Sequence, residues 1–107
     1  MAIVDAAFAL DKGASLPYFV TLSGKITEIV TPYSSDYKNI TVTIEVEGTG
    51  GKKIIECYRL KGTGADKLKV GDTITVTGVL TRYYKAATDE KPEVDKVEFN
   101  SGCTFTK

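Results

Sequence analysis

The sequence predicts an all-β domain, and three observations carry that prediction. Several segments alternate apolar residues with threonine or charged residues, the period-two pattern of strands that bury one face. Glycines separate these segments where turns are needed. Of the 107 residues, 42% are hydrophobic and 26% are charged, which is typical of an ordinary globular chain with one modest core. We therefore expect a single domain over residues 1–107, with an N-terminal helix at about 3–12 and a barrel at about 18–105.

The net charge and the histidine and cysteine content exclude several classes of function. The formal net charge is zero, so any affinity for nucleic acid would have to come from a local basic patch. Histidine is absent, which excludes Ser-His-Asp and Cys-His catalysis and histidine metal sites. Cys57 and Cys103 lie far apart in the sequence. We expect two buried thiols, with a disulfide as the alternative and a catalytic cysteine as the least favoured interpretation.

Other classes are excluded by missing patterns. The sequence shows no pair of carboxylates placed for acid–base work and no cluster of metal ligands, so we expect no enzyme, no cofactor and no metal. No apolar run is long enough to span a membrane, so no membrane insertion is expected. No signal peptide is visible at the start, although a domain cut from a longer protein would look the same.

The first half of the chain predicts one helix and two strands. Apolar residues at helical spacing from Ile3 to Leu10, followed by Gly13, predict a short helix. The first strand covers 18–30, has a glycine in its middle, and loses its alternation at Ile29, where we expect a bulge. After a loop at 31–38, residues 39–47 form the most regular alternation in the sequence.

The second half predicts three further strands. A glycine-rich turn leads to a third strand at 52–61, with an irregularity near Arg59 because Leu60 falls on the opposite parity. Residues 65–68 leave room for one helical turn. The fourth strand runs over 70–80 and bends at Gly78. Arg82, Tyr83 and Tyr84 leave this strand and enter the loop after it, and a polar stretch then leads to the fifth strand at 93–100. Phe105 is expected to pack back on the barrel.

This arrangement predicts a five-stranded OB-fold, the Greek-key barrel that binds oligonucleotides or oligosaccharides, with a short N-terminal helix and one helical turn between strands 3 and 4. An SH3-like barrel typically lacks the helical insert and so long a first strand, and an immunoglobulin-like sandwich needs about seven strands.

Four motifs also resemble a known group of proteins. They are Gly24-Lys25-Ile26, Pro32-Tyr33-Ser34 through Tyr37-Lys38-Asn39-Ile40-Thr41-Val42, Cys57-Tyr58-Arg59-Leu60-Lys61-Gly62 and Val70-Gly71-Asp72-Thr73-Ile74. Together they are similar to OB-fold modules of bacterial secreted and cell-surface proteins, which often act as accessory domains beside nucleases. The resemblance covers nearly the whole chain and implies the fold and a secreted or cell-surface origin. It implies no ligand and no binding residues.

The candidate site follows from where an OB-fold binds its ligand. The groove of such a barrel crosses strands 2 and 3 between the loops that follow strands 1 and 4. Five of the six tyrosines fall on these elements, interleaved with basic residues. Aromatic rings stack on bases, and nearby cations neutralise phosphates. The candidate ligand-binding residues are Tyr33, Tyr37, Lys38, Tyr58, Arg59, Lys61, Arg82, Tyr83 and Tyr84.

Other interpretations stay open. Each tyrosine taken alone is more often a packing residue than a ligand contact. Glu45, Glu47 and Glu56 lie on the outer face of strands 2 and 3 and would repel phosphate. We expect a non-catalytic binding module for single-stranded nucleic acid. The alternatives are an oligosaccharide-binding module and a ligand-free structural or protein-interaction domain of a larger secreted protein, placed beside neighbouring domains.

Overall fold

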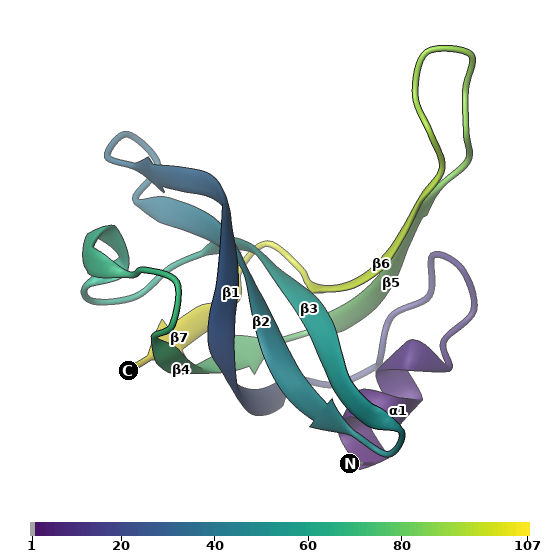
Figure 1. Ribbon diagram of the computed structural model, residues 1–107, viewed down its shortest axis with the longest axis horizontal. Helices are drawn as coiled ribbons and strands as arrows, with labels where there is room; N and C mark the ends of the chain where they lie inside the picture. Colours follow the sequence, from purple (N-terminus) through teal and green to yellow (C-terminus); the bar gives the residue numbers. More distant parts are fainter. Residues whose placement is uncertain (1) are drawn as a thin grey trace.

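One seven-stranded sheet forms most of the molecule (Figure 1). In the computed structural model, which describes residues 2–107, the strands lie in the order β5-β6-β3-β2-β1-β4-β7. The strands are β1 (Val20–Ser34), β2 (Asn39–Gly48), β3 (Gly51–Leu60), β4 (Thr73–Gly78), β5 (Leu80–Lys85), β6 (Val94–Phe99) and β7 (Thr104–Thr106). A short helix, α1 (Ala2–Phe8), precedes the sheet, and one 3-10 turn, η1 (Ala65–Lys67), connects β3 to β4.

The expected five-stranded barrel is corrected to an open sheet of seven strands. The predicted fourth strand ends at Gly78 as β4, which pairs with β1. Residues 80–85, which the sequence places at the end of that strand and in the loop after it, form a further strand, β5, which pairs with β6. The end of the chain adds β7 beside β4. The chain changes partner at Gly78, where a Cβ would lie only 2.8 Å from the Cβ of Cys103. The expected bend at this glycine is therefore the point at which β4 ends.

The two outer strands of the sheet are covered by other parts of the chain. Residues 13–16 run along β5, where the Arg82 backbone N–H donates to the Ala14 carbonyl at 2.9 Å. Lys61 lies beside β7 and accepts a hydrogen bond from the Phe105 backbone N–H at 3.0 Å. These contacts occupy backbone groups at strand edges that could otherwise pair with another chain.

β1 is a strand of 15 residues whose pairing is irregular in its second half. Its pairing with β2 shifts register on both sides of Ile29, which confirms the expected irregularity there. Gly24 lies against β2 so closely that a Cβ would come within 2.7 Å of the Glu45 carbonyl oxygen. β1 continues to Ser34, beyond the predicted end at Val30, so that the expected loop shrinks to a tight turn before β2.

The core lies on the inner face of the curved sheet. Its largest fully buried side chains are Phe99, Ile26, Ile44, Ile55, Leu60, Ile74 and Leu80. The regular alternation of the second strand is confirmed, because Ile40, Val42, Ile44 and Val46 are buried, and so is the packing of Phe105. α1 contributes buried Val4 and Ala7, and it ends at Phe8 rather than near residue 12. In the part of the chain that the structure describes, no helix is long and apolar enough to cross a membrane.

Candidate functional site

A cavity of about 480 Å³ opens on the outer face of the sheet, beside the turn between β1 and β2. Side chains from β1, β2, β3 and that turn line it, namely Thr31, Ser34, Tyr37, Asn39, Thr41, Tyr58 and Arg59. Arg59 supplies the only charge among these residues, and most of the others carry hydroxyl or amide groups. This cavity can therefore receive a flat ring and offer it hydrogen bonds without an acidic neighbour in its lining.

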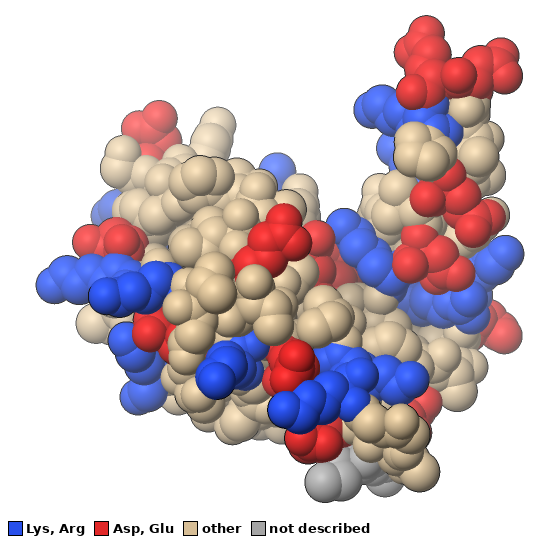
Figure 2. All heavy atoms as spheres, viewed as in Figure 1, with Lys and Arg blue, Asp and Glu red and all other residues tan. Residues whose placement is uncertain are grey.

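A second cavity of about 300 Å³ adjoins the first, because Tyr58 lines both. It lies between β3 and the hairpin of β5 and β6, and it is lined by Glu56, Tyr58, Tyr83, Val94, Lys96 and Glu98. Figure 1 shows that hairpin projecting from the body of the sheet, and Figure 2 shows an indented surface between the two, with acidic and basic residues on both sides. We call the two cavities together the Tyr58 groove.

A bulge in β3 turns both Tyr58 and Arg59 toward the groove. Ile40 pairs with Leu60 and Val42 pairs with Cys57, so two residues of β3 face one residue of β2. Arg59 has a positive φ of 52°, and its backbone N–H donates to the Thr41 hydroxyl at 3.1 Å. Its guanidinium carbon lies 5.0 Å from the centre of the Tyr58 ring. The irregularity predicted near Arg59 is thus confirmed, and it places a cation beside an aromatic ring.

The second cavity has an acidic floor. Glu56 and Glu98 are paired residues of the parallel strands β3 and β6, so their side chains lie on the same face. Lys96 neutralises Glu56 through an ion pair of 2.9 Å, and the same ammonium lies 5.4 Å from the centre of the Tyr83 ring. Glu98 is only 6% exposed, and burial is the main cause that raises its pKa. The groove therefore has a neutral to basic half and an acidic half, joined at Tyr58.

The structure brings together four of the nine predicted site residues. Tyr37, Tyr58, Arg59 and Tyr83 line the groove, and Tyr37 is 74% exposed at the turn between β1 and β2. Lys38 and Lys61 are exposed near the ends of β2 and β3 but line neither cavity. The Tyr33 ring is half-buried and packs against the core.

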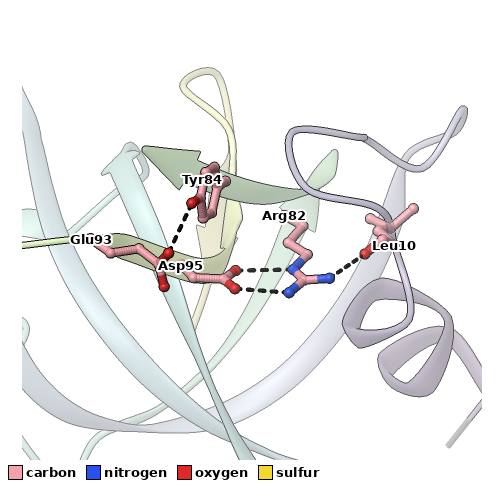
Figure 3. A network of polar contacts seen from close by, with 5 residues as sticks. All are labelled: Leu10, Arg82, Tyr84, Glu93 and Asp95. Carbon is pink, nitrogen blue, oxygen red and sulfur yellow. Dashed lines mark hydrogen bonds and ion pairs between the residues drawn. The ribbon is translucent and has the colours of Figure 1, made fainter. Parts of the chain in front are cut away.

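Arg82 and Tyr84 lie on the opposite face of the β5–β6 hairpin, where they hold the hairpin to the rest of the chain (Figure 3). The Arg82 guanidinium makes two hydrogen bonds to the Asp95 carboxylate and one, of 2.8 Å, to the Leu10 carbonyl. The Tyr84 hydroxyl donates to Glu93 at 2.8 Å, and this bond raises its pKa. Alternation along β5 explains the arrangement, because Tyr83 points to one face and its two neighbours to the other.

Sequence reasoning missed the floor of the groove. Alternation along the fifth strand points Glu98 away from the core, and in the structure it does so, yet the residue is buried. The parallel pairing of β6 with β3 places it beside Glu56 and below the two tyrosines. Glu98 and Lys96 lie far from Glu56 and Tyr58 in sequence, so only the strand order brings them together.

The two cysteines are buried free thiols, as expected. Burial raises the pKa of Cys57 well above its ordinary value and that of Cys103 to about 12. Neither thiol is therefore ionised near neutral pH, and both behave as core residues. Among residues 2–107, no group of three or more histidine, cysteine or acidic residues could hold a metal ion.

The fold is that of an OB-fold protein, as two solved structures show. Rim1, a mitochondrial single-stranded DNA binding protein from S. cerevisiae, matches with a TM-score of 0.51 and 10% identity over 84% of this chain and 90% of that chain. The small single-stranded DNA-binding protein from Streptomyces coelicolor matches with a TM-score of 0.51 and 12% identity over 78% of this chain and 87% of that chain. No family model matches the sequence, and no curated protein is similar to it. The expected link to secreted and cell-surface proteins stays a prediction.

Proposed function

We propose that this chain is a non-catalytic OB-fold module that binds single-stranded nucleic acid, in particular single-stranded DNA, in the Tyr58 groove. The observation that carries the proposal is the position of Tyr58, which lines both cavities and has Tyr37 in one and Tyr83 in the other. Three rings along one groove suit a strand whose successive bases stack on aromatic side chains. The similarity in fold to two single-stranded DNA-binding proteins supports the same ligand.

Charge determines how the strand would lie in the groove. Glu98 repels phosphate and Lys96 is already paired with Glu56, so the acidic half must receive bases rather than the backbone. Cations are available at the other half, where Arg59 lines the cavity. Lys38 follows the lining residue Tyr37 in the chain, Lys61 lies two residues after Arg59, and both lysines are exposed. The proposed strand therefore points its bases into the groove and its phosphates toward Arg59 and the exposed lysines.

The direct test is a titration of fluorescent oligo-dT with the protein, followed by fluorescence anisotropy at low and moderate salt. Tyr58→Ala should weaken binding roughly 5- to 150-fold, the range expected when one stacked base loses its ring. Tyr18→Ala is the matched control, because Tyr18 is 50% exposed and lines neither cavity of the groove. Absence of binding by the wild-type protein to oligo-dT and to mixed-sequence DNA at both salt concentrations would overturn the proposal.

An oligosaccharide is the second candidate ligand, and the floor of the second cavity is the observation that favours it. Carboxylates accept hydrogen bonds from sugar hydroxyls, and Glu56 and Glu98 share that cavity with Tyr58 and Tyr83. An uncharged glycan would not be repelled by these acids. A glycan array probed with the same sample separates the two candidates, and silence in both assays favours a structural or protein-interaction role.

A further inference from the structure

Glu98 is a buried carboxylate that faces the groove. Its residue is only 6% exposed, and it lines the second cavity together with Tyr58 and Tyr83. Across residues 2–107, no backbone or side-chain group donates a hydrogen bond to it. Because no fully enclosed side-chain oxygen among these residues lacks a partner, the Glu98 oxygens keep contact with the open cavity. The nearest cation on its own strand, Lys96, is engaged with Glu56 at 2.9 Å. The hydrogen-bonding capacity of Glu98 is thus left to whatever occupies the cavity.

Such a carboxylate needs a donor from any ligand that closes the cavity over it. A ligand that fills the cavity would remove the remaining hydration of its oxygens, and this loss costs free energy unless the ligand supplies a hydrogen-bond donor. Burial and the neighbouring Glu56 raise the pKa of Glu98, and Lys96 only partly opposes them. A ligand that supplies an N–H donor would replace that hydration with a hydrogen bond, so the site favours ligands that carry one.

The two rings determine which part of a base would meet Glu98. Tyr58 and Tyr83 lie on either side of the cavity, on β3 and β5, and a base stacked on one of them directs an edge toward the floor. Cytosine presents an exocyclic amino donor on that edge, as do adenine and guanine. Thymine presents two carbonyl oxygens, which repel a carboxylate, with only one imino N–H between them. In this geometry a base with an exocyclic amino group would be favoured over thymine.

We propose that Glu98 is a specificity-determining residue of the Tyr58 groove, where it accepts a hydrogen bond from the exocyclic amino group of a bound base. The inference rests on the proposed function, because it requires single-stranded DNA to enter the groove. The preference is local to the second cavity. The first cavity, lined by hydroxyl and amide groups and by Arg59, offers both donors and acceptors and makes no such distinction.

The test compares oligo-dC with oligo-dT of equal length at pH 7.5 and one salt concentration, for three proteins. The wild type should bind oligo-dC roughly 5- to 150-fold more tightly, the discrimination expected from one well-made contact to a base edge. Glu98→Gln should bring the ratio close to one, because an amide can donate to thymine as well as accept from cytosine. Glu28→Gln removes the same charge from an exposed position on β1 and should keep the wild-type ratio.

The outcomes separate the two proposals. A preference for oligo-dC that is lost in Glu98→Gln and kept in Glu28→Gln supports the role of Glu98. Equal binding of both oligomers by the wild type overturns that role and leaves single-stranded DNA binding intact, as does a preference that survives in Glu98→Gln. Failure of the wild type to bind either oligomer overturns both proposals.

Discussion

Arg82 and Asp95 form a two-bonded ion pair across the β5–β6 hairpin, with Nε 2.9 Å from Oδ1 and Nη2 2.8 Å from Oδ2. The pair raises the pKa of Arg82 and lowers that of Asp95. A third guanidinium nitrogen donates to the Leu10 carbonyl, so the same side chain ties the hairpin to the segment after α1 (Figure 3). Arg82 therefore supports the groove from behind, because its strand neighbour Tyr83 lines the other face.

A double-mutant cycle on Arg82 and Asp95 should show that the two residues are coupled in their effect on stability, while the affinity for single-stranded DNA stays the same. Arg82→Ala and Asp95→Ala should each lower Tm by a few degrees, and the double variant should lower it by less than their sum. Thermal unfolding followed by circular dichroism measures the cycle. The affinity for oligo-dT should be unchanged in all three variants. A large loss of affinity in Arg82→Ala, at a temperature where that variant is fully folded, would mean that Arg82 contacts the ligand.

The sequence predicts the framework well, because strand alternation and glycine positions are local signals. The parity change at Leu60 marks the bulge that presents Tyr58 and Arg59, and the structure contains it. The strand β5 is not predictable in the same way, since most of its residues are polar or aromatic and only their pairing with β6 makes them a strand rather than a loop.

The candidate site was predictable in part, because the predicted fold indicates which elements bind a ligand. Tyr37, Tyr58 and Tyr83 lie on elements that OB-folds use for binding, so fold and position identified them together. Arg82 and Tyr84 lie on the face of β5 opposite the groove, because side chains alternate along that strand. Which of the two faces each residue takes depends on where β5 begins, and the sequence around Gly78 does not indicate that position. The floor made by Glu98 depends on a parallel pairing between strands distant in sequence, and no local pattern reveals such a pairing.

A substitution at Gly24 tests how closely β1 and β2 are packed. A Cβ at this position would lie 2.7 Å from the Glu45 carbonyl oxygen and 3.1 Å from the Ile44 Cβ, so the backbone itself must move. Gly24→Ala should lower the free energy of unfolding by about 1–3 kcal/mol, as overpacking does elsewhere. Gly50→Ala in the β2–β3 turn is the control, because a Cβ there has no neighbour within 4 Å, and it should stay within about 0.5 kcal/mol of wild type. Urea unfolding measures both, and equal stability of the two variants would contradict the close packing.

Arg59 should contribute a measurable part of the salt dependence of binding. Its guanidinium lies beside the Tyr58 ring at the mouth of the neutral half, where the proposed strand places a phosphate. Arg59→Gln should reduce the slope of log Kd against log salt by about 0.7, the value for one phosphate contact on a single strand. Lys91→Gln, at an exposed position in the loop between β5 and β6, is the control. An unchanged slope for Arg59→Gln would mean that the phosphates pass elsewhere.

Glu98 should make the protein less stable as its carboxyl ionises. Its pKa in the folded protein is raised above the ordinary 4.5, chiefly by burial and further by Glu56, while Lys96 opposes the shift. Below pH 4.5 the Glu98 carboxyl is protonated in both the folded and the unfolded protein, so folding buries no charge at this residue. As the pH rises through that value, the unfolded chain loses the proton first, so stability falls until the folded protein also ionises.

Glu98→Gln cannot titrate, so comparison with the wild type isolates this effect from that of every other carboxyl group. The difference in Tm, variant minus wild type, should increase between about pH 4 and pH 7 and then level off once Glu98 is ionised in both states. Glu28→Gln, at an exposed position, should show no comparable increase. A difference that stays constant with pH would mean that the Glu98 carboxylate is as well solvated in the native state as in the unfolded chain. That result would remove the reason for expecting it to seek a donor from a bound base.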